Sequence, residues 1–291
     1  MSGAAGYVVQ ARDLAILRGF YECRTMTLRH VADLHFAGSY KAAQKRVAVL
    51  KRAGLLRELT PVGVGESAAL VFRPKAYRLL VEHQALGELP AVGWKVLEKR
   101  ADISPVTLRH ELDVVSVRAA FENSARSSES PTLEVVRFTT WPRLVKFRSR
   151  RLRPKAGESP LLTLHPDGYA EVATASTIEP HRRWYFFLEV DRSTESLDRL
   201  VEKMHAYRDF YTRGGFARRQ GMDPDDFKRY PYRVLFTFRT EARRKNAAAA
   251  FAEARPKLGG MPWLTKFDQT ITDPLGSIWQ TPASNERRPL F

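Results

Sequence analysis

The chain has 291 residues, and its 48 Lys and Arg outnumber its 32 Asp and Glu to give a formal net charge of +16. Such a surplus attracts polyanions and is typical of nucleic-acid-binding proteins, although a ribosomal or membrane-surface partner would also fit. The single cysteine, Cys23, excludes an internal disulfide and a thiolate-rich zinc site. A chain of this length favours about two domains.

Motifs of several other protein classes are missing from the sequence. It has no run of about 18 apolar residues, and its first residues lack the basic and apolar regions of a signal peptide. The seven histidines never take a metal-ligand spacing such as HExxH, and no GxxxxGK[ST] phosphate loop occurs. We therefore expect a cytoplasmic protein with no membrane partner, no ATPase site and no structural metal.

Three helices are predicted at the start of the chain. Apolar residues at helical spacing predict the first over residues 13–24 and the third over residues 39–53. The second begins at an N-cap, either Thr25 or Thr27, and ends before Gly38.

A hairpin is predicted to follow the third helix. Gly54 ends that helix as a left-handed C-cap, and two extended segments, residues 55–59 and 69–72, are joined by a turn that contains Pro and Gly. Three helices followed by a hairpin is the order of a winged helix-turn-helix domain, which we assign to residues 1–100.

The third predicted helix has an apolar side and a basic side. Ala43, Val47 and Leu50 share the apolar side. In the major groove of double-stranded DNA, Gln44 would read adenine, and lysine or arginine would read guanine or hold phosphates. The alternative is a trihelical module that binds protein or forms a homodimer. The candidate DNA contacts are Ser39, Tyr40, Lys41, Gln44, Lys45, Arg46 and Arg52.

A second domain is predicted over residues 101–291. It begins with a helix that Ser104 caps and that runs to about Ala125, followed by a strand at residues 133–138. Further elements are predicted as a strand at 232–238, a helix at 241–254, a strand at 263–267 and an irregular tail from residue 273.

Residues 137–155 form a basic run, with eight Lys or Arg and no acidic residue. Such a run is often a solvated flexible loop. Its aromatic residues Trp141 and Phe147 favour contact with nucleic acid instead. The candidate DNA contacts in the run are Arg148, Arg150 and Arg151.

Two further predicted strands carry acidic side chains in apolar surroundings. These strands are predicted at residues 161–169 and 184–192. In a hairpin centred on Ile178, Asp167 and Glu189 lie opposite each other with Cβ atoms about 5 Å apart. Because side chains alternate along a strand, Asp191 joins Glu189 on that face. Three carboxylates so close repel one another unless a cation intervenes, which predicts Mg²⁺ or Mn²⁺ bound for phosphodiester hydrolysis.

A helix capped by Ser193 or Thr194 is predicted after these strands, with Lys203 and Tyr207 one turn apart on its flank. Lys203 would stabilise the charge that develops on a phosphate, and Tyr207 would orient DNA or act as a nucleophile. The non-catalytic alternative treats Asp167 as a turn former.

The two acids of the second strand also have a purely structural interpretation. Glu189 and Asp191 could be salt-bridged to Arg192 or Lys203 at the end of that strand.

Several stretches together resemble the plasmid replication-relaxation proteins, and the resemblance covers nearly the whole chain. It is carried by RDLAIL at residues 12–17, HELDV at 110–114, PDG at 166–168 and FLEVDRSTE at 187–195, with Lys203 and Tyr207 behind them. The sequence is similar also to relaxases and to accessory proteins of the MobC type, which mobilise plasmids.

The resemblance implies a winged helix joined to a core like the PD-(D/E)xK nucleases, a central mixed sheet flanked by helices. Asp167 and Glu189 match the two acids of that motif, whereas Asp191 stands where the motif has its lysine. Either Lys203 substitutes for it and the protein nicks DNA with Mg²⁺ or Mn²⁺, or the site is degenerate. A degenerate site would make the protein a non-catalytic accessory factor or transcriptional regulator, acting with other mobilisation or replication proteins.

Overall fold

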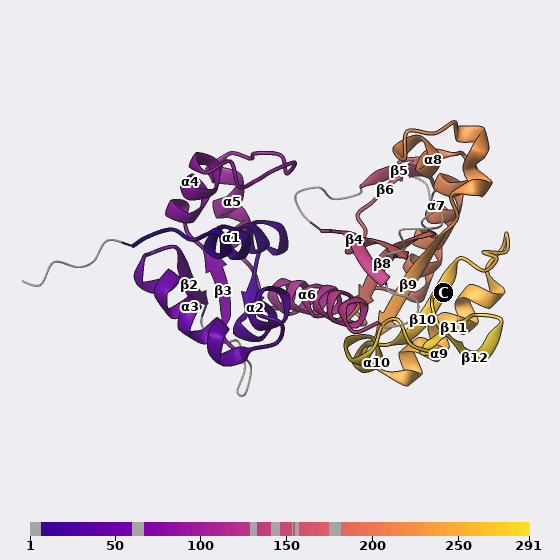
Figure 1. Cartoon of the computed structure of the whole chain (residues 1–291). Coiled ribbons are helices and arrows are strands. Elements are labelled where there is room, and N and C mark those ends of the chain that lie inside the picture. The colour runs from indigo at the N-terminus through magenta and orange to yellow at the C-terminus, as the bar shows by residue number, and fades with distance from the viewer. Residues whose placement is uncertain are drawn as a thin grey trace, which may run out of the picture. The chain divides into compact units, whose positions relative to one another are not determined.

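The computed structural model describes residues 7–59, 67–128, 133–140, 146–152, 154, 157–174 and 182–291. Within them the chain has a mixed α/β architecture and divides into two compact units, at residue 119 inside one long helix (Figure 1). Each unit has its own hydrophobic core.

The first unit consists of helices and three short strands. Its elements are α1 (Ala11–Cys23), β1 (Met26–Thr27), α2 (Leu28–His35), α3 (Tyr40–Arg52), β2 (Leu56–Leu59), β3 (Ala69–Phe72), α4 (Pro74–Glu82), α5 (Trp94–Ala101) and the larger part of α6 (Pro105–Arg126). The strands form one antiparallel sheet in the order β1-β3-β2. The three helices and the hairpin therefore occur in the predicted order.

Local signals end and begin these helices as the sequence predicts. Thr27 is the cap of α2, because its hydroxyl accepts a hydrogen bond from the backbone N–H of His30 at 3.3 Å. The other candidate cap, Thr25, instead donates to the carbonyl of Leu70 in β3 at 3.0 Å. Gly54 follows α3 with φ of 72°, the left-handed conformation of a C-cap. The turn at residues 60–66 lies outside the described residues.

The second unit is built on a large mixed sheet. Its elements are β4 (Leu133–Thr139), β5 (Phe147–Arg150), β6 (Leu161–Leu164), β7 (Gly168–Thr174), β8 (Arg183–Asp191), α7 (Leu197–Thr212), α8 (Gly215–Arg219), η1 (Pro224–Arg229), β9 (Tyr232–Phe238), α9 (Glu241–Glu253), β10 (Pro262–Lys266), α10 (Phe267–Thr272), β11 (Trp279–Thr281) and β12 (Ser284–Arg288). The seven strands run in the order β12-β11-β10-β9-β8-β7-β4, with β8, β9 and β10 parallel to one another.

The two faces of this sheet are covered by different elements. Phe187 and Phe236 lie in the cluster that α7 and α9 form with one face. On the other face, the ring of Phe186 contacts Phe121 of α6 and the C-terminal Phe291. Because β8 alternates between these faces, its odd-numbered residues point toward α7 and α9.

Two predictions for this unit are wrong. The strand predicted at 161–169 is two strands, since β6 pairs with β5 in a separate two-stranded sheet and β7 begins only at Gly168. Pro166, which has no N–H to donate, lies between them. The tail predicted to be irregular forms β11 and β12, held by the fully buried Trp279, whose indole N–H donates to the carbonyl of Pro274 at 2.8 Å.

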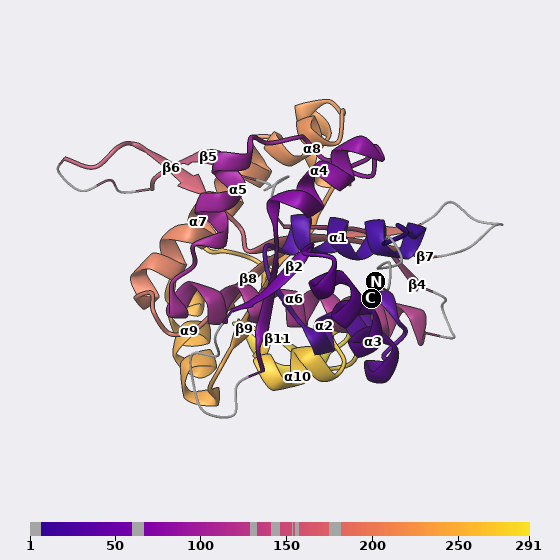
Figure 2. The ribbon, with the colours of Figure 1, turned by 90° about the vertical axis from the view of Figure 1, so that its left-hand side faces the viewer.

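The small β5–β6 sheet lies against α7 (Figures 1 and 2). The hydroxyl of Ser149 donates to the carbonyl of Ala206 and to the carboxylate of Asp209, both on α7. Phe147 is buried and stacks on Phe210 of the same helix, with ring centroids 3.9 Å apart. One face of β5 is therefore fixed to α7, and the other face remains at the surface.

Candidate functional site

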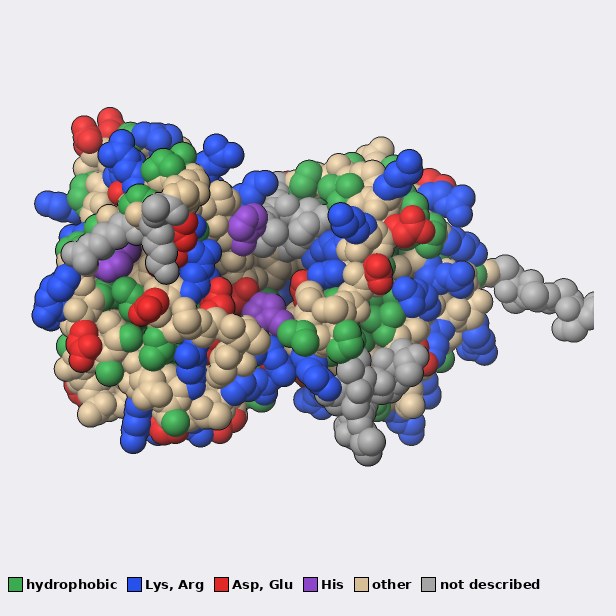
Figure 3. Space-filling view, turned by 180° about the vertical axis from the view of Figure 1, so that it is seen from behind, with side chains coloured by type: hydrophobic (Ala, Val, Ile, Leu, Met, Phe, Trp, Pro, Cys, Tyr) green, Lys and Arg blue, Asp and Glu red, His purple; other side chains and the backbone are tan. Residues whose placement is uncertain are grey.

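One side of α3 carries exposed polar and basic side chains, and the other side is buried in the first core. Ala43, Val47 and Leu50 are buried. We call the exposed residues of this helix the α3 surface: Tyr40, Lys41, Gln44, Lys45, Ala48 and Arg52. Ser39 is exposed just before the helix begins. Figure 3 shows Lys and Arg side chains spread over the exposed surface of both units.

Arg46 does not belong to this surface, although the sequence suggested it as a DNA contact. Its guanidinium forms a two-armed ion pair with Asp13 of α1, whose side chain is fully buried. Burial alone would raise the pKa of Asp13, but the hydrogen bonds from Arg46 and from the backbone of Gln10 hold that pKa below its usual value. The physical reason is position on the helix, since Arg46 leaves α3 on the side that faces α1.

In the second unit, Asp167 lies just before the start of β7, near Glu189 at the end of β8. The register agrees with the predicted hairpin as far as the pair Gly168–Leu188, and Asp167 lies in a bend just before β7 instead of pairing with Glu189. The backbone N–H of Asp167 donates to the carbonyl of Leu188 at 3.0 Å, and the N–H of Val190 donates to the carboxylate of Asp167 at 2.7 Å. These bonds hold the Asp167 side chain along β8.

Glu189 is held by two side chains of α7. The hydroxyl of Tyr207 donates to one carboxylate oxygen at 2.5 Å, and the ammonium of Lys203 donates to the other at 3.0 Å. Lys203 also forms an ion pair with Glu195 at 2.6 Å. Burial and the charge of Asp167 raise the pKa of Glu189 to about 7, against the opposing effect of Lys203. We call Asp167, Glu189, Lys203 and Tyr207 the acidic cluster.

Asp191 lies on the same face of β8 but does not join this cluster. Its carboxylate pairs with Arg243 of α9, at 2.7 Å from Nε, and accepts from the N–H of Ser193 at 3.2 Å. The same guanidinium donates to the carbonyl of Glu195 at 2.6 Å. The three carboxylates therefore do not converge as predicted. Glu189 and Asp191 instead form separate ion pairs, because α7 covers the position of Glu189 and α9 covers the position of Asp191.

These residues do not fit a hard divalent ion in the arrangement observed. Both oxygens of Glu189 already accept hydrogen bonds, and Asp191 is paired to Arg243. Within the described part of the chain, no group of three or more His, Cys, Asp or Glu is placed to hold a metal ion. The cation beside Glu189 is the ammonium of Lys203.

The two α7 residues of the acidic cluster differ in exposure. Tyr207 is fully buried, and burial together with the charge of Glu189 raises the pKa of its hydroxyl well above the ordinary value. A buried phenol held by a carboxylate cannot contact DNA or attack a phosphate without moving. Lys203 keeps 16% of its side chain exposed. The cap predicted for α7 is also displaced, since Ser196 rather than Ser193 or Thr194 accepts from the first turn.

Of the three DNA contacts predicted in the basic run around β5, only two are exposed. Arg148 and Arg150 are exposed on the outer face of the strand. Arg151 is instead paired with Glu202 of α7. Phe147 is a core residue and not a platform for stacking on a base. Trp141 lies outside the described residues.

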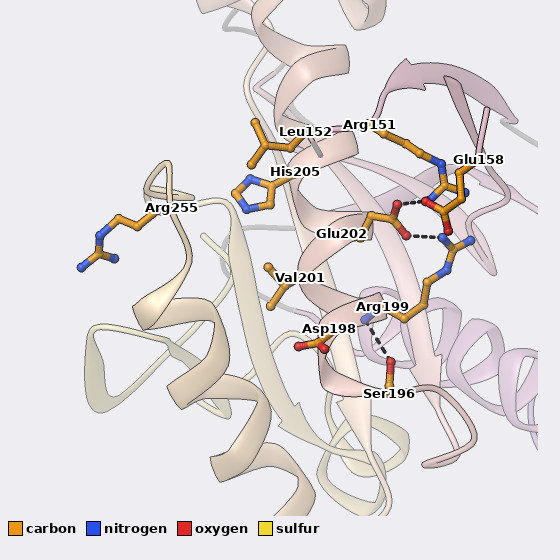
Figure 4. Close-up of a pocket in the computed structure, with 10 residues that line it drawn as sticks. All are labelled: Arg151, Leu152, Glu158, Ser196, Asp198, Arg199, Val201, Glu202, His205 and Arg255. Atoms are coloured by element: carbon orange, nitrogen blue, oxygen red, sulfur yellow. Dashed lines mark hydrogen bonds and ion pairs between the residues drawn. The ribbon is translucent and has the colours of Figure 1, made fainter. Parts of the chain in front are cut away.

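A pocket of about 660 Å³ lies along the outer side of α7 (Figure 4). Arg151 and Arg199 both reach Glu202 there, while Arg255 points away from them. Because a helix has about 3.6 residues per turn, the α7 residues that line this pocket lie on the side opposite Lys203 and Tyr207. The pocket is therefore separate from the acidic cluster, and its charges are largely matched.

Sequence reasoning missed Asp13 as the partner of Arg46 and Arg243 as the partner of Asp191. No spacing signal connects residues so far apart in the chain. A weak signal existed for Asp13, an acid among the apolar residues of the first helix. Nothing in the sequence distinguished Arg243 from the neighbouring Arg244, which pairs with Glu241.

Comparison with known proteins identifies a family. The family model described as replication-relaxation matches residues 17–225, which is more than half of the chain. No curated protein and no solved structure matches. Among the described residues, no helix is long and apolar enough to cross a membrane. The chain belongs to the replication-relaxation family.

Proposed function

We propose that the protein binds double-stranded DNA through the α3 surface and serves as an accessory factor in the replication or mobilisation of a plasmid or related mobile element. Membership of the replication-relaxation family suggests the biological process. The observation that carries the DNA-binding part is the α3 surface itself. It exposes two lysines, one arginine and one glutamine, and it has no acidic residue.

The order of elements around α3 supports this proposal. Helices α1, α2 and α3 followed by the β2–β3 hairpin is the order of a winged helix-turn-helix, in which the third helix enters the major groove. Gln44 would bond the edge of an adenine, and Lys41 and Lys45 would reach guanine or phosphate oxygens. The small side chain of Ala48, about one turn after Gln44, would allow the helix to approach the bases closely.

The face of β5 would supply a second contact to the sugar-phosphate backbone. Lys146, just before β5, and Arg148 and Arg150 within it are exposed at every second position, which spaces their Cα atoms about 6.6 Å apart where the backbone is extended. The opposing β6 residues are Thr163 and Leu161, so no acidic side chain of the paired strand opposes them. Such a row binds phosphates without reading sequence.

Binding of a labelled duplex at several salt concentrations tests the proposal. A Lys41→Ala/Lys45→Ala variant should bind more weakly, and the slope of log affinity against log salt should become less negative by about 0.9 for each phosphate that is no longer neutralised. The matched control is Lys95→Ala/Lys99→Ala, which removes two exposed lysines of α5. Equal decreases in affinity in the two variants would show that only net charge matters and would contradict recognition by α3.

Nicking of DNA is the second candidate function, and one observation favours it. Two acids and a lysine, Asp167, Glu189 and Lys203, meet at the end of adjacent strands of a mixed sheet flanked by helices. This is the set of residue types in a PD-(D/E)xK-like nuclease, in which Mg²⁺ or Mn²⁺ would supply Lewis-acid chemistry. The ion pairs that occupy Glu189 argue for the accessory role.

The two functions separate in a relaxation assay on supercoiled plasmid with Mg²⁺ or Mn²⁺. An accessory factor leaves the plasmid supercoiled while it binds. Nicking that stops with a chelator and in Glu189→Gln would instead establish a metal-dependent nuclease. Duplex binding by the same samples shows that each variant is folded.

A further inference from the structure

We infer that Asp13 and Arg46 form a buried clamp that fixes the orientation of α3, which makes Arg46 a positioning residue for the α3 surface. The inference rests on the proposed function, because it concerns how α3 presents its exposed residues to duplex DNA. It assigns Arg46 a role different from that of its neighbours Gln44 and Lys45, although all three follow one another closely on the helix.

The clamp joins three segments of the first unit at one carboxylate. Arg46 of α3 donates from Nε to one oxygen of Asp13 at 2.5 Å and from a terminal nitrogen to the other. The hydroxyl of Tyr7, in the segment before α1, donates to the second oxygen at 2.7 Å. The backbone N–H of Gln10 donates to that same oxygen at 3.0 Å. The side chain of Asp13 is fully buried, so these four donors replace its hydration.

A two-armed arginine–carboxylate pair restricts orientation as well as distance. The planar guanidinium meets the plane of the carboxylate in one geometry, and the pair therefore resists rotation of α3 about its own axis. Rotation would move the exposed side of the helix relative to the hairpin that follows it. Since the residues that would read bases lie on that exposed side, the clamp would set which of them reach the groove.

Geometry also distinguishes Arg46 from a phosphate contact. Its guanidinium faces α1, and only 19% of its side chain is exposed. The lysines of the α3 surface lie on the other side of the helix. Contact with a phosphate would require Arg46 to leave Asp13, which would then be a buried carboxylate without its cation, an unfavourable state.

The two roles predict opposite effects of Asp13→Asn. If Arg46 binds DNA directly, removing the acid frees the guanidinium and removes a negative charge, so affinity should rise. If the pair is a positioning clamp, Asp13→Asn and Arg46→Gln should each weaken binding by about tenfold, roughly the effect of removing one good base contact. The double variant should be no worse than either single one, because both remove the same interaction.

The experiment measures the affinity of the full chain for a labelled mixed-sequence duplex over a range of salt concentrations. The expected result is weaker binding in both single variants with an unchanged salt slope, since every phosphate contact remains in place. Arg46→Lys should not restore affinity, because an ammonium cannot make the two-armed pair. Tyr7→Phe, which removes one hydrogen bond and leaves the ion pair, is the mild variant if Asp13→Asn does not fold.

Each outcome has a distinct meaning. Stronger binding by Asp13→Asn, or a salt slope less negative by about one in Arg46→Gln, would overturn the clamp and make Arg46 a DNA contact. Unchanged affinity in folded variants, Tyr7→Phe included, would reduce the pair to a stabilising contact and also overturn it. A wild-type chain whose binding matches that of Lys41→Ala/Lys45→Ala would overturn the proposed function first.

Discussion

The α3 surface and the acidic cluster are both built from charged residues, yet they use those charges in opposite ways. Lys41 and Lys45 are exposed on a helix whose other side is buried. Glu189 of β8 and Lys203 of α7 form a largely buried ion pair with each other. An exposed charged side chain can bind a charged partner, whereas a charge buried in an ion pair can do so only if that ion pair breaks. This difference makes the first unit the better candidate for recognition of DNA.

Removing one partner of the buried ion pair between Glu189 and Lys203 should have the strongest consequence. At pH 8, above the pKa of about 7 that Glu189 has in the folded protein, Lys203→Met should destabilise the second unit by about 3–5 kcal/mol, because Glu189 would be left buried without its cation. Lys45→Met should change stability by no more than about 0.5 kcal/mol, as expected for an exposed residue. Urea unfolding followed by hydrogen exchange in each unit measures both. Similar small effects would mean that the acidic cluster is more open to water than the contacts of Glu189 indicate.

The pH dependence of stability should have opposite signs in the two units. The pKa of Glu189 is raised by burial to about 7, so the folded second unit keeps a proton that the unfolded chain releases, and stability falls as pH rises from about 4.5 to 7. Burial lowers the pKa of His30 in α2 to about 4. The unfolded chain therefore takes up the proton first, and stability of the first unit falls as pH drops from about 6.5 to 4.

Each titrating group contributes a slope of up to about 1.4 kcal/mol per pH unit. The measurement is hydrogen exchange of α2 and β8 amides between pH 4 and 7, compared with His30→Gln and Glu189→Gln. Each substitution should flatten the slope of its own unit and leave the other unit unchanged. Slopes of the same sign in both wild-type units would contradict this account.

Within the α3 surface, the glutamine should govern sequence preference and the lysines should govern affinity. Gln44→Ala should reduce discrimination between the preferred and other sequences by about 1–3 kcal/mol, with the salt slope unchanged. Selection from a randomised duplex library, followed by affinity measurement on the selected and a scrambled duplex, tests this. A uniform decrease in affinity across all sequences would instead show that Gln44 contacts the sugar-phosphate backbone of the DNA.

The smallest effect is expected at the exposed ion pair between Lys51 at the end of α3 and Glu58 of β2, whose side chains are 36% and 51% exposed. Glu58→Gln should cost no more than about 1 kcal/mol, in contrast to the buried pair of Lys203. Thermal unfolding at low and high salt measures the change. An effect as large as that of Lys203→Met would abolish the contrast between exposed and buried pairs.

Features that depend on local periodicity could be predicted from the sequence alone. Helical spacing identified the side of α3 that faces solvent, and the left-handed Gly54 marked its end. Counting outward from Ile178 gave the register of the β7–β8 hairpin, in which Gly168 pairs with Leu188 and Tyr169 with Phe187. These signals lie within a few turns or one hairpin, so no distant contact was needed to read them.

The ion-pair partner of each charged side chain, in contrast, depends on tertiary packing. Asp191 faces the same side as Glu189, but α9 rather than α7 covers its position and supplies Arg243. Arg46 is one residue from Lys45, yet it leaves α3 in another direction and pairs with Asp13 of α1. The physical reason is that alternation and helical spacing fix the direction in which a side chain leaves its own element, while its ion-pair partner depends on which distant element packs there.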